Sequence, residues 1–195
     1  MINTKLRRRL FDATLLTWLT SVPPDRVGVT RLLRLSKTLK PTVHGGFDLD
    51  LSTPDAHKTA AVFGPTRTAV PAATAELLAA WLQLVGLSTS TLEPYVFVLS
   101  TKVGHDKPID SKRWTEVVKA VFKRHSGVAM APKELRSSYV TFLRSEENSD
   151  AALKAAALAM RHSTKQQASA AYDKGVAARL SAAAVAQAQR SAARF

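Results

Sequence analysis

Several basic residues lie where predicted helices begin, and their chemistry suits phosphate groups. Arg26 follows Pro23-Pro24 at the start of one predicted helix, and Lys133 and Arg136 lie three residues apart near the start of another. Residues with that spacing share one helix face. A guanidinium binds two phosphate oxygens through a planar fork, although an arginine at a helix start opposes the helix dipole. These side chains therefore fit either a phosphate site or an ordinary solvated surface.

The charge of the whole chain favours a polyanionic partner. Its 195 residues include 28 Lys and Arg against 15 Asp and Glu, which gives a net charge of +13. Nucleic acid is the commonest partner of such a protein, because each neutralised phosphate releases counterions. An acidic protein and an RNA-rich particle are the alternatives.

The composition excludes several classes of site. The sequence has no Cys, which rules out disulfides, thiolate-bound zinc, iron–sulfur clusters and thiol chemistry. Its five His are scattered without metal-ligand spacing, so no metal and no other cofactor is expected. No apolar run reaches the ~18 residues of a membrane span. Arg7-Arg8-Arg9 lacks the apolar stretch and cleavage site of a signal peptide behind it.

The hydrophobic pattern predicts helices around a small sheet in the first half of the chain. Leucines at helical spacing predict an amphipathic helix over 5–20, and Asp25 is a plausible N-cap for a second helix over 26–35. Between residues 36 and 71, Gly and Pro punctuate short segments, of which the first alternates apolar and polar residues. They predict a three-stranded antiparallel sheet with strands within 47–52, 57–63 and 66–70.

The second half is predicted to be mostly helical. One short buried strand is expected at 95–99, and Pro132 fits the first turn of a helix. The fold class is therefore α+β, mostly α, with a small antiparallel sheet of three strands in the N-terminal half. The predicted helices of this half cover 73–86, 111–125, 132–144 and 149–162.

Four segments in order, and at plausible distances, resemble one family. The segments are 23–35, 57–71, 132–143 and 160–174, and the resemblance covers about residues 5–175. They are similar to the catalytic domain of tyrosine recombinases, the phage-integrase-like enzymes, and most of all to members carried by eukaryotic mobile elements. The resemblance implies a site-specific recombinase or integrase, which breaks and rejoins DNA through a 3′-phosphotyrosine with chemistry like that of type IB topoisomerases.

The resemblance also implies a role for each matching residue. The reaction needs fixed cations around one phosphate and an acid for the leaving 5′ oxygen, and arginines can supply the charge without a metal. By this match Tyr172 is the nucleophile, Arg26 and Arg136 clamp the phosphate, Lys58 is the general acid, Lys133 assists, and His162 binds the phosphate.

The chain departs from the family pattern at three places. Lys133 stands where many relatives have His, and Arg161 stands where Gly is usual before His162. Tyr172 follows His162 at a distance one residue longer than usual in the family. The last two departures, together with the expected absence of the family's N-terminal clamp domain, favour the alternative function, a catalytically decayed recombinase fold that binds DNA without strand exchange. Without the family context, His162 would be read as a residue that caps a helix end.

Other lysines and tyrosines compete for the same roles. Lys102 and Lys107 lie in a loop and are rivals of Lys58. Tyr95 is predicted to be a buried strand residue and Tyr139 a core residue, whereas Tyr172 is expected to be exposed beside charged neighbours.

The resemblance divides the chain into residues 1–175, the catalytic domain, and residues 176–195, an Ala-rich helical tail. It implies that double-stranded DNA is the partner and that the tail docks on a neighbouring subunit within a homotetramer, although a frayed terminus fits the tail equally well. The N-terminal clamp domain of the family is expected to be absent. The protein is expected to be intracellular, and nuclear if its source is eukaryotic.

Overall fold

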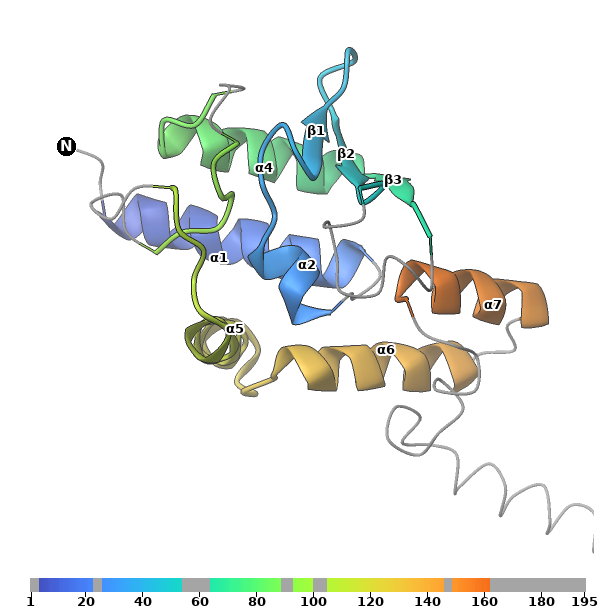
Figure 1. Cartoon of the computed structure of the whole chain (residues 1–195). Helices are drawn as coiled ribbons and strands as arrows, with labels where there is room; N and C mark the ends of the chain where they lie inside the picture. The colour runs from blue at the N-terminus through green and yellow to red at the C-terminus, as the bar shows by residue number, and fades with distance from the viewer. Residues whose placement is uncertain are drawn as a thin grey trace, which may run out of the picture. The chain divides into compact units, whose positions relative to one another are not determined.

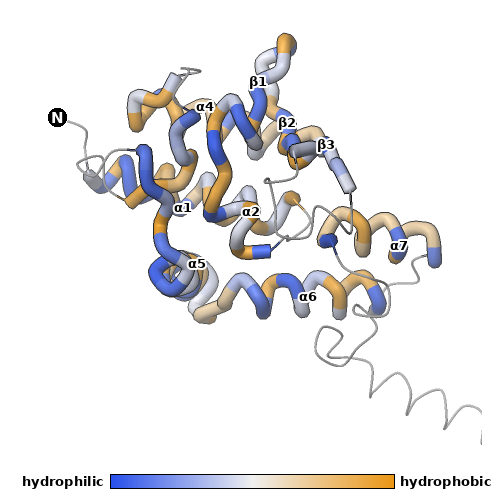
Figure 2. The backbone as a smooth tube through the Cα atoms, in the orientation of Figure 1, coloured by the Kyte–Doolittle hydropathy of each residue, from blue (hydrophilic) through white to orange (hydrophobic). Residues whose placement is uncertain are grey.

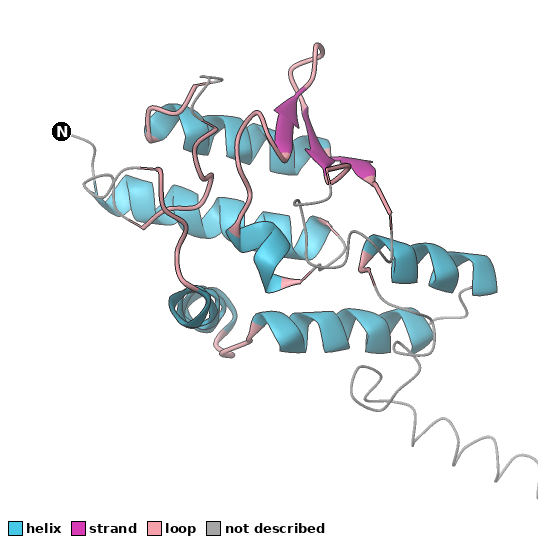
Figure 3. Cartoon of the chain, in the orientation of Figure 1, coloured by secondary structure: helices cyan, strands magenta, loops and turns pink. Residues whose placement is uncertain are grey.

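The computed structural model of the chain describes residues 4–22, 26–53, 64–88, 93–99, 105–145 and 149–161 (Figure 1). These residues belong to two compact units, residues 1–132 and residues 133–195, which are described separately. Within the described ranges no helix combines the length and the apolar content that crossing a bilayer requires. Figure 3 shows one small sheet among helices, and this architecture confirms the predicted fold class.

Long helices provide the core of the first unit. The chain begins with α1 (Thr4–Ser21), which packs against α4 (Ala72–Leu84). The Phe11 ring of α1 meets the edge of Trp81 on α4, with ring centroids 5.3 Å apart. Phe97 joins the cluster and also contacts Trp114, which is fully buried. Aromatic pairs in these edge-on arrangements add to the stabilisation that apolar burial provides.

Local signals in the sequence define the ends of α5 (Ser111–Ser126). The Asp110 side chain accepts a hydrogen bond of 2.9 Å from the Arg113 amide, as an N-cap residue does. Gly127 ends the helix with a φ of 77°, which glycine adopts without steric cost. The helix is strongly hydrophilic in Figure 2, and it buries the narrow apolar stripe of Trp114, Val118, Val121 and Phe122.

The three-stranded antiparallel sheet is confirmed, but one of its strands differs from the prediction. The order is β1 (Leu39–Pro41), β2 (Phe47–Asp50) and β3 (Arg67–Ala69), with Leu39 opposite Leu49. The predicted strand at 57–63 lies outside the described residues. Strand β1 was not predicted, because it has only three residues and ends in a proline.

The second helix is much shorter than the predicted 26–35. It is α2 (Val27–Arg31), and the chain continues in extended form, with Arg34 paired to Tyr95. Leu33 and Leu35 are both buried in that extended segment. Their spacing of two residues fits an extended chain as well as a helix, and tertiary pairing decided between them.

The segment 95–99 is not a strand. It contributes one isolated bridge, at Tyr95, and the Val96 amide donates to the Leu33 carbonyl over 2.9 Å. Val96, Phe97 and Val98 are buried in succession. Burial was therefore predicted correctly, although the segment has too few backbone partners for a strand.

The second unit contains α6 (Pro132–Ser145) and α7 (Asp150–Ala159), both close to their predicted bounds. Ser149 caps α7 by accepting from the Ala152 amide at 3.2 Å. Helix α7 buries Ala156 and Ala157, while Met160 at its C-cap is fully buried.

Candidate active site

Arg136 lies in the interior of the protein, one turn into α6. Its exposed fraction is 8%, which excludes the solvated surface position that its sequence context left open. Its Nη2 donates a hydrogen bond of 3.3 Å to the carbonyl oxygen of Met160, the C-cap residue of α7. The side chain is therefore held at the point where the chain leaves α7, two residues before His162 in the sequence.

Lys133 lies one turn before Arg136 and has the opposite environment. Its side chain is exposed, while its carbonyl accepts a hydrogen bond of 3.2 Å from Ser137 Oγ. On the helix face predicted for the two residues, Lys133 is therefore exposed and Arg136 is buried. An exposed amine at this place can reach an approaching phosphate at little cost in desolvation.

The end of α7 has an unusual conformation at Arg161. This residue has a φ of 51° and an exposed fraction of 3%. Burial lowers the pKa of its guanidinium to about 10. A positive φ is the region that glycine adopts most readily and that a long side chain disfavours. His162 follows directly but lies outside the described residues.

Arg26 occupies the N-cap position of α2, so the helix begins one residue later than predicted. Its backbone is extended, with φ −63° and ψ 148°, and its carbonyl accepts from the Val29 amide at 2.9 Å. The Arg26 side chain is half-buried and forms no capping hydrogen bond to the helix. Asp25, the predicted N-cap, lies outside the described residues.

Three of the predicted site residues, Lys58, His162 and Tyr172, lie outside the described residues, as does the rival Lys102. In sequence Lys58 lies in the connection between β2 and β3, which are antiparallel neighbours. The Leu51 amide donates to the Thr66 carbonyl at 2.8 Å, and this bond extends the pairing toward that connection. The other rival, Lys107, is exposed.

Neither of the two tyrosines within the described residues is fully exposed. Tyr139 is half-buried, and burial raises the pKa of its hydroxyl, which makes it a poorer nucleophile at neutral pH. Tyr95 is half-buried, with the Arg34 guanidinium carbon 5.3 Å from its ring centroid. Arg34 also pairs with Glu93 at 3.4 Å.

Other cations of the first unit form ion pairs with aspartates, and these ion pairs were not predicted from the sequence. Asp12 on α1 is buried and accepts from Arg124 and from His125 on α5, the latter at 2.9 Å. Lys40 of β1 pairs with Asp50 of β2 at 2.8 Å. The Asp12 partners lie 112 and 113 residues away in the sequence, so no local pattern could have revealed them.

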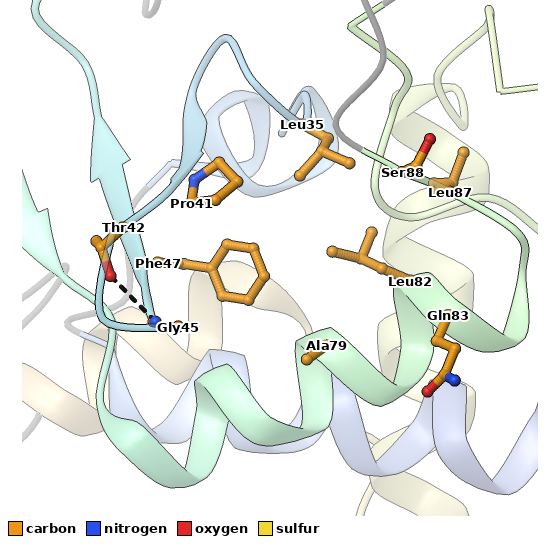
Figure 4. Close-up of a pocket in the computed structure, with 11 residues that line it drawn as sticks. Leu35, Pro41, Thr42, Gly45, Phe47, Ala79, Leu82, Gln83, Leu87 and Ser88 are labelled. Atoms are coloured by element: carbon orange, nitrogen blue, oxygen red, sulfur yellow. Dashed lines mark hydrogen bonds between the residues drawn. The ribbon is translucent and has the colours of Figure 1, made fainter.

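The described part of the chain also contains an apolar hollow away from these cations. It has a volume of about 330 Å³ and lies between the β1–β2 hairpin and the C-terminal part of α4. Figure 4 shows the Phe47 ring pointing between Pro41 and the α4 residues Ala79 and Leu82. The described residues that line it carry no charge, so it does not suit a phosphate. In the same ranges no group of three His, Asp or Glu side chains is placed to hold a metal ion.

Comparisons with known proteins agree with the fold. No family model matches the sequence, and neither does any curated protein. Among solved structures, the crystal structure of XerA recombinase matches with a TM-score of 0.56 at 13% sequence identity. The match covers 87% of this chain and 58% of the XerA chain, so this chain spans just over half the length of that neighbour. The chain therefore has the fold of a tyrosine recombinase, a mostly helical domain with one small three-stranded antiparallel sheet.

Proposed function

We propose that this chain is the catalytic domain of a site-specific DNA recombinase or integrase of the tyrosine type. The Tyr172 oxygen attacks a backbone phosphorus, a 3′-phosphotyrosine bond forms, and the bond to the 5′ oxygen breaks. The proton of the tyrosine hydroxyl passes to water, and Lys58 delivers a proton to the 5′ oxygen. Arg26, Arg136 and His162 hold the phosphate, and Lys133 donates to it.

The position of Arg136 carries the proposal. A guanidinium with an exposed fraction of 8% is costly to bury unless its donors have partners, and its Nη2 bonds to a neutral carbonyl oxygen. Charge held in a fixed place and shielded from water stabilises a developing phosphorane more than a mobile surface charge does. The fold shared with XerA recombinase supports the same reading.

The finer parts of the proposal concern partners and origin. The partner is double-stranded DNA, which the net charge of +13 favours. The active assembly is a homotetramer on DNA, with residues 176–195 docked on the neighbouring subunit. Residues 1–175 form the catalytic domain, which is of the type carried by eukaryotic mobile elements. It acts inside the cell, and in the nucleus if its source is eukaryotic.

A trapping experiment tests the chemistry. Duplexes tiled from the DNA that flanks the coding sequence, each with a nick close to the candidate cleavage point, release a short fragment on cleavage and prevent religation. Wild type is expected to give a covalent protein–DNA adduct on a denaturing gel, and Tyr172→Phe none. Salt-dependent DNA binding without any adduct would support instead a decayed recombinase fold that only binds DNA.

The role of Lys58 has its own test. A duplex whose leaving 5′ oxygen is replaced by sulfur needs no proton donor, because a thiol has a pKa of about 8.5. Lys58→Ala is expected to lose cleavage of the ordinary duplex and to recover it on the sulfur duplex. Recovery by Lys107→Ala but not by Lys58→Ala would assign the acid to the rival lysine.

A further inference from the structure

The end of α7 supplies a backbone oxygen to the candidate site. The Met160 amide donates to the Ala156 carbonyl and the Arg161 amide to the Leu158 carbonyl, each at 3.0 Å, so both amides are used within the helix end. The last carbonyls of a helix have no intrahelical donor. The carbonyl of Met160 is one of these, and it accepts from Arg136 Nη2 at 3.3 Å.

The conformation of Arg161 is what ends the helix at this point. If α7 continued, the Met160 carbonyl would accept an amide four residues further on. The φ of 51° at Arg161 breaks the helical path instead. A left-handed residue directly after the C-cap is the usual way to end a helix, but the residue is usually Gly, sometimes Asn, and rarely a long side chain.

Two unfavourable features coincide at Arg161. Its backbone is in a region that side chains disfavour, and its cation is desolvated at an exposed fraction of 3%. Strained positions persist where the surrounding structure fixes them, and they cluster at functional sites. The contact of the neighbouring Met160 carbonyl with Arg136 is a reason for the chain to keep this shape.

We propose that Arg161 is a positioning residue that acts through its backbone: its left-handed conformation presents the Met160 carbonyl to Arg136 and so sets the orientation of the guanidinium. A guanidinium has five N–H donors in one plane, and a hydrogen bond to one of them restricts the directions in which the others can point. This inference deepens the proposed function and rests on it. It predicts that a substitution at residue 161 preserves cleavage if the new residue tolerates a positive φ, whatever the charge of its side chain.

A substitution series at residue 161 separates backbone from side chain. Arg161→Gly and Arg161→Asn tolerate the left-handed region, whereas the β-branched side chain of Arg161→Val does not. Single-turnover cleavage of the nicked duplex is expected within about 3-fold of wild type for Gly and Asn. For Val it is expected to fall roughly 10- to 100-fold at unchanged DNA affinity, because a small misplacement near the reacting atoms costs about that much.

Gly127→Val is the matched control. Gly127 also follows a helix in the left-handed region, with a φ of 77° and no atom within 4 Å of an added Cβ. This variant is expected to lose stability in urea without losing the cleavage rate of the folded protein. Loss of cleavage in Arg161→Gly together with its retention in Arg161→Lys would overturn the proposal, since the side-chain cation would then be the active part.

A second readout keeps the inference independent of the chemistry. Nitrogen-15 NMR reports the exchange of the Arg136 guanidinium protons with water, whether or not DNA is cleaved. Slow exchange is expected in wild type and in Arg161→Gly, and faster exchange in folded Arg161→Val. If wild type gives no adduct but shows this pattern, the proposed function fails and the positioning role stands. Equal exchange rates of the Arg136 guanidinium protons in all three proteins would contradict the positioning role.

Discussion

Arg124 in the first unit and Arg136 in the second unit meet different kinds of acceptor. In the first unit Arg124 and His125 meet the buried carboxylate of Asp12, and Lys40 meets Asp50. In the second unit the guanidinium of Arg136 donates to the Met160 carbonyl. We infer that the Asp12 cluster holds α1 and α5 together, whereas Arg136, buried and bonded to the end of α7, is placed to meet an anion.

The largest effect expected from this difference concerns Arg136. Arg136→Ala should lower the rate of covalent adduct formation about 100- to 1000-fold, the usual cost of removing one preorganised donor from a transition state. Arg136→Lys should recover little of it, because an ammonium lacks the planar fork. The measurement is single-turnover cleavage of the nicked duplex at saturating protein.

Arg124→Ala is the matched control in the first unit. Its partner Asp12 is on the neighbouring helix α1, and their contact belongs to the α1–α5 packing. The variant should lose stability and keep the cleavage rate of the folded fraction. A comparable loss of rate in both variants would show that the two kinds of partner do not separate structural from site arginines.

The second-largest effect expected is a loss of stability when Asp12 is replaced. Asp12→Asn keeps the size of the side chain but removes the charge that Arg124 and His125 meet, so the free energy of unfolding should fall by about 2 kcal/mol. Urea unfolding followed by tryptophan fluorescence measures it. An unchanged midpoint would mean that desolvation of Asp12, whose side chain is 4% exposed, cancels the attraction.

The helices were predicted well because each carries its own signals. Pro132 opens α6, Asp110 and Gly127 bound α5, and apolar spacing marks α1. The failures lie where tertiary pairing decides the conformation. The segment after Arg31 satisfied a helical period but is extended, because the backbone of Arg34 pairs with that of Tyr95, which is far away in the sequence.

The candidate site was predictable only in part. Spacing could place Lys133 and Arg136 on one helix face, but it could not tell that one is exposed and the other buried. Arg161 stands where the resembling family usually has Gly, and the sequence alone did not show that its backbone has a positive φ. A side chain does not specify its own φ, so this feature needed coordinates.

A third, smaller effect depends on pH and tests the carboxylates of the first unit. Hydrogen bonds from Lys40, and then from Ser52, lower the pKa of Asp50 well below its usual value of about 4. As the pH falls, the Asp50 carboxyl therefore takes up a proton in the unfolded chain before it does so in the folded chain. The stability that this group contributes is fully present above about pH 4 and is lost as the pH falls below that value. Asp50→Asn should lower stability at pH 7 by on the order of 1 kcal/mol, since solvent screens the Lys40 side chain, which is 41% exposed.

The measurement is urea unfolding of both proteins at several pH values between 7 and 3. The difference between wild type and Asp50→Asn should shrink toward pH 3. A difference that stays constant over this range would mean that the Asp50 carboxyl does not change its protonation between the folded and unfolded chain there, and that its contribution comes from packing instead.

The smallest effect expected is on DNA binding, and it compares two exposed lysines. Lys133 lies one turn from Arg136, and Lys123 lies in the last turn of α5; both side chains are exposed. A lysine that meets one phosphate contributes about 0.9 to the slope of log affinity against log salt. Lys133→Ala should therefore lower that slope by about 0.9 and weaken binding severalfold at moderate salt, while Lys123→Ala should change neither.

Fluorescence anisotropy with one labelled duplex, titrated at four salt concentrations, resolves such a difference. Equal slopes for the two variants would mean that binding follows net charge alone, and the contrast between the units would then be confined to the chemistry of Arg136.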